Sequence, residues 1–252
     1  MFSFPLFKQT VKSNSVIWGV MTLVMTILCI QFAVMDMTQE LLFTIFYGMM
    51  TTILPGIYVL VTANKLISSQ VDRGSMAYVL STPTRRATVV FTQMVYLTGS
   101  LVVMFAIQTV AHLIVNTSTP IALGKLGYVD LAGNLTNAMI LQVNLSALMV
   151  CIAMAGACFL FSGIFNASKF SIGFSGTFVG VTVLANMMAM FGKLGVSGLD
   201  NFKYFTICSF YDYESILHGV NDWVLKMIFP IGIAVVTYVI GSIWFCKKDL
   251  PL

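Results

Sequence analysis

Six long apolar stretches divide the chain, and they limit what it can fold into more than any other feature. A bilayer core about 30 Å thick is crossed by a helix of roughly 20 apolar residues, and the stretches are of this order of length. The predicted spans are Val16–Val34, Leu41–Ala63, Val89–Val115, Met139–Phe165, Ile172–Phe191 and Val224–Phe245. We therefore expect an all-α, polytopic membrane protein with six transmembrane helices.

The composition excludes a water-soluble fold. Charged residues make up 9% of the chain and hydrophobic residues 58%, whereas average soluble domains are about 25% charged and 45–50% apolar. So few charges cannot cover a soluble globule, which excludes a soluble enzyme, a disordered tail and a secreted disulfide scaffold. The five cysteines have no C-x-x-C spacing, so neither a metal site nor a disulfide framework is expected.

The distribution of Lys and Arg predicts the orientation in the membrane. Nine of the 13 basic residues fall in the N-terminal arm, the second and fourth connections and the C-terminal tail, all on one side of the predicted topology. Only Lys125, Lys193 and Lys203 fall on the other side, and Lys226 begins the last span. Because basic residues accumulate on the cytoplasmic side of membrane proteins, both termini are predicted to be cytoplasmic.

The N-terminal arm, residues 1–15, is predicted to be an interfacial helix. Phe4, Phe7 and Val11 share one helical face at i, i+3 and i+7, with lysines beside it. Such a helix lies in the headgroup region with its apolar face toward the acyl chains. The alternative is an extension of the first span.

The whole chain, residues 1–252, is expected to be a single transmembrane domain. Two further segments outside the spans are long enough to have roles of their own, the cytoplasmic connection 64–88 and the outer segment 192–223. The outer segment is rich in Phe and Tyr. Because aromatic rings settle at membrane interfaces, we expect this segment to dip into the interface.

The chain lacks the residues of several membrane functions. None of the nine carboxylates lies inside a predicted span, although ion-coupled carriers usually need an ionisable group there. The phosphate-binding motif G-x-x-x-x-G-K-[ST] is also missing. We therefore expect no enzyme activity, no catalytic residue and no cofactor or metal in this chain, and an energy source in another subunit. Topology accounts for the basic excess, so no nucleic-acid partner is expected.

A few polar residues do lie inside the spans. Gln108 and His112 are four residues apart on one face of the third span, Asn144 lies in the fourth and Asn186 in the fifth. These four residues form a candidate substrate path. The alternative is hydrogen bonding between helices, which contributes about 1 kcal/mol or less per bond in a membrane.

Small and helix-breaking residues also occur inside the spans. Pro55 and Gly56 form a candidate hinge in the second span, because Pro removes a backbone donor and frees a carbonyl group. A static kink is the alternative. The small-x-x-x-small patterns Gly176–Gly180 and Ala153–Ala157 predict close helix packing in the fifth and fourth spans. A subunit interface is the alternative.

The cytoplasmic connection is the most distinctive local feature. Ile67, Val71 and Tyr78 fall on one helical face, and Gly74 and Pro83 then interrupt the pattern. A short amphipathic element at the cytoplasmic surface fits a surface on which a motor protein docks. A loop anchored to lipid headgroups by its basic residues is the alternative.

The same connection resembles a stretch of a known family. Gly74-Ser75-Met76, Val79-Leu80-Ser81-Thr82-Pro83 and Arg85 are similar to the G-T-L-E-x-L-L-S-x-P-x-S-R stretch of type-2 ATP-binding-cassette (ABC) transporter permeases. Ala77 departs from this pattern, since family members usually have Glu there. The likeness in topology extends over the whole chain, whereas the motifs cover only part of it.

Three other segments share this likeness. The N-terminal arm resembles the family's interfacial elbow helix, and Asn166–Ser171 matches its second cytoplasmic contact. Residues 202–219 resemble the segment before the last span in Gram-positive members.

The resemblance implies the permease subunit of an ATP-driven exporter in a bacterial cell membrane. The cargo would be hydrophobic or amphipathic: a peptide, an antimicrobial, a drug or a lipid. The partners would be two cytoplasmic ATPase subunits, which bind ATP and Mg²⁺, and a second permease subunit, identical or homologous. The residues expected to couple to the ATPase are Ile67, Val71, Arg73, Gly74, Met76, Leu80, Pro83, Arg85, Asn166 and Lys169. An ATP-independent carrier and a non-transporting membrane partner are the alternatives.

Overall fold

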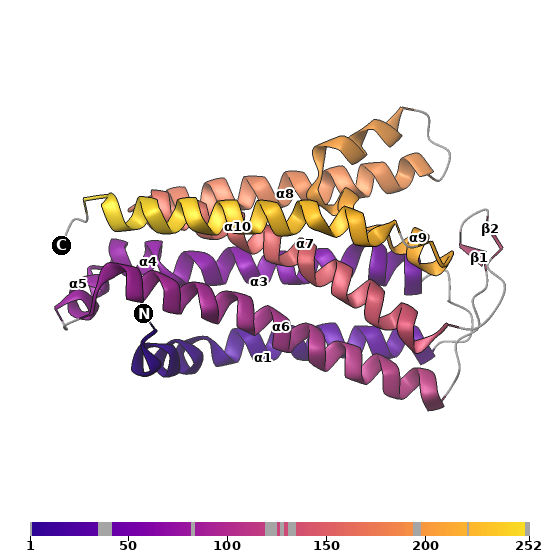
Figure 1. Ribbon diagram of the computed structural model, residues 1–252, viewed down its shortest axis with the longest axis horizontal. Helices are drawn as coiled ribbons and strands as arrows, with labels where there is room; N and C mark the ends of the chain where they lie inside the picture. Colours follow the sequence, from indigo (N-terminus) through magenta and orange to yellow (C-terminus); the bar gives the residue numbers. More distant parts are fainter. Residues whose placement is uncertain are drawn as a thin grey trace.

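The structure is a computed structural model that describes residues 2–34, 42–81, 84–118, 125–126, 129–130, 135–193, 198–220 and 222–249. Long helices lie side by side in one elongated bundle (Figure 1). Six helices in the described residues are long and apolar enough to cross a membrane. The main elements of these six spans are α1 (Phe4–Val34), α3 (Thr51–Leu66), α6 (Arg86–Ser118), α7 (Asn137–Ile164), α8 (Ser168–Lys193) and α10 (Trp223–Lys247). The prediction of an all-α membrane protein with six spans is confirmed.

Short elements connect the long helices at the two ends of the bundle. The π-helix η1 (Leu42–Met50) leads directly into α3. At one end lie α4 (Ser68–Asp72) and α5 (Ser75–Leu80) (Figure 1). The elements toward the other end are β1 (Lys125–Leu126), β2 (Val129–Asp130), η2 (Leu199–Phe205), η3 (Ile207–Phe210) and α9 (Tyr213–Leu217). The strands β1 and β2 are antiparallel, with Lys125 opposite Asp130 and Leu126 opposite Val129.

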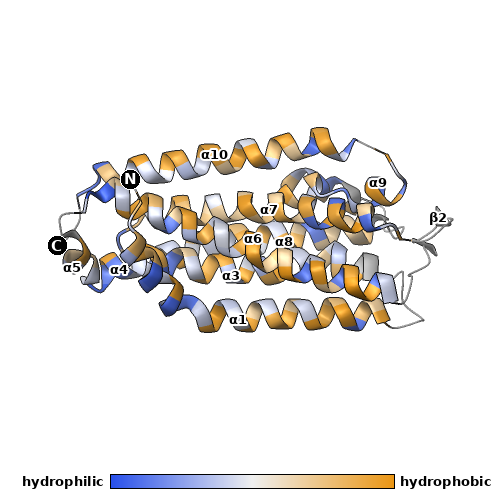
Figure 2. Cartoon of the chain, turned by 60° about the horizontal axis from the view of Figure 1, so that its bottom comes forward, coloured by the Kyte–Doolittle hydropathy of each residue, from blue (hydrophilic) through white to orange (hydrophobic). Residues whose placement is uncertain are grey.

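Both chain ends lie at the same end of the bundle, together with α4 and α5 (Figure 1). Figure 2 shows hydrophilic segments gathered there, whereas the long helices are largely hydrophobic. The nine basic residues that the sequence assigned to one side of the membrane belong to the first turns of α1, the segment from the end of α3 to the start of α6, the start of α8 and the end of α10, all at this end of the bundle. We call it the basic end.

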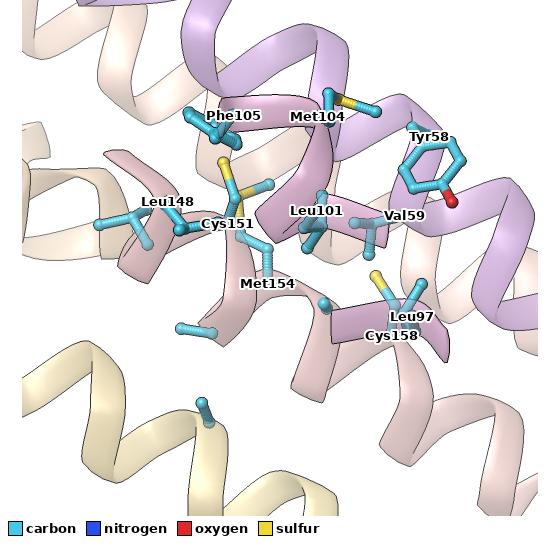
Figure 3. Packing of buried hydrophobic residues seen from close by; sticks show 14 of the residues in the cluster. Tyr58, Val59, Leu97, Leu101, Met104, Phe105, Leu148, Cys151, Met154 and Cys158 are labelled. Carbon is cyan, nitrogen blue, oxygen red and sulfur yellow. The ribbon is translucent and has the colours of Figure 1, made fainter. Parts of the chain in front are cut away.

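The helix α7 occupies the centre of the bundle. In its most apolar stretch 72% of the residues are buried, against 22% for α1 and 28% for α8 and α10. It packs against α10, α3, α6 and α8. Figure 3 shows side chains of α3, α6 and α7 packed together, among them Val59, Leu101 and Met154.

Glycines bring the backbones of α7 and α10 into direct contact. A Cβ atom on Gly241 of α10 would lie 2.9 Å from the Cα atom of Leu160. A Cβ atom on Gly163 of α7 would lie 2.8 Å from the carbonyl oxygen of Gly241. Lipid tails are as apolar as Leu, so packing of this kind, rather than a hydrophobic driving force, holds membrane helices together.

The prediction of close packing at Gly176 and Gly180 in the fifth span is wrong within the described chain. Gly180 would have open space around a Cβ atom, and Gly176 would make only an ordinary contact with Leu60. The helix that contains them, α8, lies at the periphery of the bundle, so neither glycine makes a tight contact with another helix of the described chain. A subunit interface at these glycines stays a prediction. In the fourth span Ala153 and Ala157 are buried, as close packing requires.

We expect Gly241→Ala to destabilise the protein by roughly 1–3 kcal/mol, because the new methyl group must push two backbones apart. Gly232→Ala on the same helix is the matched control, since nothing lies within 4 Å of its Cβ position. Thermal unfolding in detergent, followed by loss of the monodisperse peak, measures both. Equal stability of the two variants would contradict the assigned contact.

The N-terminal arm is continuous with the first span. The helix α1 begins at Phe4 and runs unbroken to Val34, so the arm forms its first turns. In Figures 1 and 2 these turns bend away from the line of the rest of α1. The backbone amide of Ser3 donates to Thr92 Oγ1 at 3.1 Å, and Thr10 Oγ1 lies 3.2 Å from Gln93 Oε1. These contacts with α6 fix the bent arm against the bundle.

Candidate functional site

Three of the predicted coupling residues anchor the cytoplasmic connection in the bundle. Ile67 and Val71 are 1% exposed and Met76 is fully buried. They belong to the same core as α3 and α6. Their side chains therefore hold α4 and α5 in place and are not exposed for contact with another protein. Their role in coupling to an ATPase stays a prediction.

A left-handed glycine separates the two short helices. Gly74 has φ 69°, a conformation that costs a residue with a Cβ atom about 1 kcal/mol or more, and it ends α4 before α5 begins. The prediction that Tyr78 shares a face with Ile67 and Val71 is wrong, because the helical register restarts after Gly74. Tyr78 is instead 80% exposed. The sequence analysis did not include it among the site residues.

The exposed surface of this element is basic and aromatic. Arg73, Tyr78 and Arg85 are exposed. Pro83 and the side chain of Leu80, both predicted to couple to a partner, lie outside the described residues. The surface available to a partner therefore includes two cations and one large aromatic ring. We call these three residues the exposed coupling surface.

Hydrogen bonds join α4 to the connection between α7 and α8. The backbone amide of Ser168 donates to Asp72 Oδ2 at 3.3 Å, so an acidic group lies at the N-terminus of α8, where the helix dipole favours it. Asn64 Nδ2 donates to Ser168 Oγ at 2.8 Å. Ser68 Oγ donates to the carbonyl oxygen of Phe165 at 3.2 Å. The predicted second contact, with Asn166 and exposed Lys169, is thus directly linked to the first.

The end of α10 is part of the same arrangement. Asn166 Nδ2 donates to the carbonyl oxygen of Asp249 at 3.3 Å, and Lys248 Nζ donates to that of Phe165 at 3.3 Å. Arg86 Nη1 donates to the carbonyl oxygen of Lys248 at 2.9 Å. Ends of α6, α7, α8 and α10 therefore meet beside α4.

Partial burial of Lys248 disfavours its charged form. Desolvation lowers the pKa of its ammonium group from the ordinary 10.5 to about 8. Between these two values the unfolded chain binds more protons than the folded one. Stability against unfolding therefore rises with pH across this window.

We expect Lys248→Met to remove most of the rise in stability between pH 8 and pH 10.5. Lys247→Met, at the exposed neighbouring position, is expected to leave the rise unchanged. Thermal unfolding at several pH values in a non-ionic detergent measures the slope for each protein. A slope that is the same in all three proteins would rule out Lys248 as its source.

The candidate substrate path is mostly a buried polar cluster. Asn144 Nδ2 donates to Tyr47 Oη at 3.2 Å, and Tyr47 Oη lies 2.5 Å from His112 Nδ1. Gln108 Nε2 donates to Asn144 Oδ1 at 3.0 Å. All four side chains are at most 2% exposed. They hydrogen-bond η1, α6 and α7 to one another, as the alternative interpretation expects, and a role in a substrate path stays a prediction.

Tyr47 belongs to this cluster, although nothing in the sequence pattern pointed to it. A tyrosine in an apolar stretch has no signal of its own, because its ring is as apolar as the neighbouring residues. The wider turn of the π-helix η1 precedes Pro55 and changes the register at which side chains face α6 and α7. Only the helix packing shows that the Tyr47 hydroxyl meets His112 and Asn144.

We expect Gln108→Leu and Asn144→Leu to lower the free energy of unfolding by about 1 kcal/mol each, and the double variant by less than the sum. The reason is that both single variants remove the same Gln108–Asn144 bond. The control cycle pairs Gln108→Leu with Asn186→Leu and should be additive. Denaturant titration in mixed micelles measures both cycles, and additivity in the first cycle would refute the coupling.

Asn186 lies apart from the buried cluster. Its Nδ2 atom donates to the carbonyl oxygen of Gly48 at 2.9 Å. It lines a cavity of about 440 Å³ near the end opposite the basic end, together with Asp212 and Lys226. The sequence placed Asn186 and the other three residues in one group because it does not show which helix faces meet.

The outer segment closes over this cavity. Asp212 accepts a hydrogen bond from Lys226, and both the amide and the hydroxyl of Ser215 donate to its carboxylate. Burial raises the pKa of the Asp212 carboxyl, but the hydrogen bonds from Lys226 and Ser215 outweigh it and hold the pKa below its ordinary value. Tyr204 and Phe205 are 76% and 72% exposed, so their rings are free to enter the interface.

The candidate hinge is packed on several sides. Pro55 has no N–H to donate to the Thr51 carbonyl, and Cys151 Sγ of α7 donates to that oxygen at 3.6 Å. A Cβ atom on Gly56 would lie 3.0 Å from Met154 Cε and 3.3 Å from a methyl group of Val179. The freed carbonyl is thus satisfied by a neighbouring helix. A hinge motion at Pro55 stays a prediction, and it would have to break this contact.

The described residues contain no group of three or more His, Cys, Asp or Glu side chains that could hold a metal ion. No protein-family model matches the chain, and no curated protein matches its sequence. The fold therefore defines the class by itself: an all-helical, multi-pass membrane protein.

Proposed function

We propose that this chain is the permease subunit of an ATP-driven ABC exporter, with ATP hydrolysis in a separate subunit. The observation that supports the proposal most is the α4–α5 element at the basic end. It presents Arg73 and Tyr78 outward, and Arg85 is exposed directly before α6. Val71 and Met76 anchor the element in the core. A rigidly anchored element with an exposed aromatic ring suits docking to a moving partner, because aromatic and Arg side chains dominate interface energetics.

The contacts of this element offer a route for force. A displacement of α4 would act on the N-terminus of α8 through the Asp72–Ser168 hydrogen bond. The same junction connects to α10 and α6 through Lys248 and Arg86. In the proposed mechanism two cytoplasmic ATPase subunits close on ATP and Mg²⁺ and push on α4 and α5. A pair of permease subunits, identical or homologous, then opens a path outward.

The orientation follows from charge. The basic end is proposed to face the cytoplasm of a bacterial cell, because positively charged residues are retained on that side during insertion. The ATPase subunits would then reach α4 and α5 from the water phase.

The proposed cargo is hydrophobic or amphipathic. An apolar hollow of about 780 Å³ opens on the side of the bundle between α6, α7 and α10. It is lined by Val102, Ile152 and Val235 among others, and the one tyrosine on its wall, Tyr238, is 6% exposed. Such a surface would accept acyl chains or an apolar peptide face rather than a polar solute.

We expect Tyr78→Glu with Arg85→Glu to abolish binding of the ATPase. Together the two substitutions make the net charge of the exposed coupling surface more negative by three units and remove its aromatic ring. Tyr204→Glu is the matched control, since this tyrosine is 76% exposed on the outer segment. The chain is co-expressed with candidate cytoplasmic ABC ATPases and purified through a tag on itself. Co-elution of an ATPase is then quantified.

Co-elution with the unaltered chain and with Tyr204→Glu, but not with the double variant, would support the proposal. If no ATPase co-elutes with the unaltered chain, the proposal fails, and transport by a purified, reconstituted chain along a gradient becomes the next measurement. That measurement separates the two alternatives, since a carrier transports alone and a non-transporting partner does not.

A further inference from the structure

A polar cavity lies at the basic end between the first turns of α1 and the cytoplasmic connection. Its volume is about 410 Å³. Its walls come from α1, the end of α3, α4 and α5. The lining contains two cations, Lys65 and Arg73, and no acidic side chain. The cavity therefore favours an anionic ligand.

The two cations are available to such a ligand. Lys65 Nζ donates to the carbonyl oxygen of Ser13 at 2.6 Å, which holds the ammonium group at the cavity wall without neutralising it. Arg73 is exposed, and no carboxylate in the described part of the chain pairs with either cation. The neighbouring Asp72 is bonded to the amide of Ser168. The cavity lining thus carries two positive charges that no carboxylate in the described part of the chain neutralises.

Neutral hydrogen-bonding groups complete the lining. Gln9, Ser69 and Gln70 are among them. Asn14 also lines the cavity and is 2% exposed. Its Nδ2 atom donates to the carbonyl oxygen of Thr10 at 2.9 Å, whereas its Oδ1 atom is buried without a hydrogen-bond partner in the described residues. A buried acceptor without a partner costs about 1–3 kcal/mol, so a ligand that brings a hydroxyl or an ammonium donor would relieve it.

The cavity lies where the bundle enters the bilayer. Farther along α1, Val16 and Val20 are 78% and 56% exposed and face the lipid. Before them, Lys8 and Lys12 are exposed on the same helix. A change from exposed lysines to exposed valines within a few turns marks the headgroup level. The phosphates of the bilayer are the nearest abundant anions at that level.

We propose that this cavity binds the phosphate-bearing headgroup of an anionic phospholipid, with Lys65 and Arg73 at the phosphate and Asn14 at a headgroup hydroxyl. The walls of the cavity belong to two separate segments, the first turns of α1 and the α4–α5 element. A bound headgroup joins these segments and holds the cytoplasmic connection against α1. Binding of a headgroup needs no ATPase, although the cavity shares Arg73 and Tyr78 with the exposed coupling surface.

The test measures lipid binding to the purified full-length chain by native mass spectrometry. The probes are phosphatidylglycerol, phosphatidylcholine with the same acyl chains, and inorganic phosphate. The unaltered chain should bind phosphatidylglycerol in preference to phosphatidylcholine. Lys65→Gln with Arg73→Gln should weaken phosphatidylglycerol binding roughly tenfold or more, since each basic residue contributes on the order of 1 kcal/mol at an anionic surface.

Lys8→Gln with Lys12→Gln is the matched control. It removes the same charge from exposed positions at the same end of the molecule, and neither residue lines the cavity. This control should keep the affinity of the unaltered chain. Equal weakening in the two double variants, or no preference for phosphatidylglycerol in the unaltered chain, would overturn the proposal.

Two further measurements decide the remaining cases. Because Lys65 also holds Ser13, Arg73→Gln alone is measured in parallel, and unaltered affinity in that variant also overturns the proposal. If inorganic phosphate displaces phosphatidylglycerol at equal concentration, the site takes free phosphate and the lipid assignment is wrong. No displacement, together with the loss in the variants, assigns the site to the lipid.

Discussion

Direct backbone contact between α7 and α10 is the interaction on which the rest of the bundle depends. At Gly163 and Gly241 no side chain separates the two helices. The contact fixes α10 on one side of α7 and leaves the other sides of α7 free to bury α3, α6 and α8. In a bilayer this is the effective way to join helices, because burial of apolar side chains gains little when lipid surrounds them. The helices α3, α6, α8 and α10 are therefore positioned directly by α7, whereas α1 packs on α6 and α3.

A second constraint is that backbone and polar groups in the membrane must find partners within the protein. Pro55 leaves the Thr51 carbonyl without its helical donor, and Cys151 of α7 supplies one. The amide of Asn144 similarly meets Tyr47 and Gln108. These contacts tie the second span to its neighbours at defined heights, so they specify register as well as stability.

The basic end combines firm anchoring with an exposed surface. Val71 and Met76 hold the short helices from below, while Asp72 connects them to α8. Tyr78 and Arg73 remain exposed. In the two proposals made above, this small element contacts both an ATPase from the water phase and a headgroup from the bilayer. An element anchored in this way transmits displacement to the helices, because its buried side chains cannot move without them.

The amino-acid sequence by itself determined the class, the number of spans and the gathering of positive charge at one end, because these depend only on apolar length and on where the charges fall. It also located the cytoplasmic connection and the polar residues Gln108, His112 and Asn144. Only the tertiary structure decided that Tyr47 completes their cluster, that Gly163 and Gly241 rather than Gly176 and Gly180 form the tight contact, and that Tyr78 points outward. These features depend on which helix faces meet and on a register change at Gly74. Neither can be read from local periodicity, since apolar residues surround every face of a membrane helix.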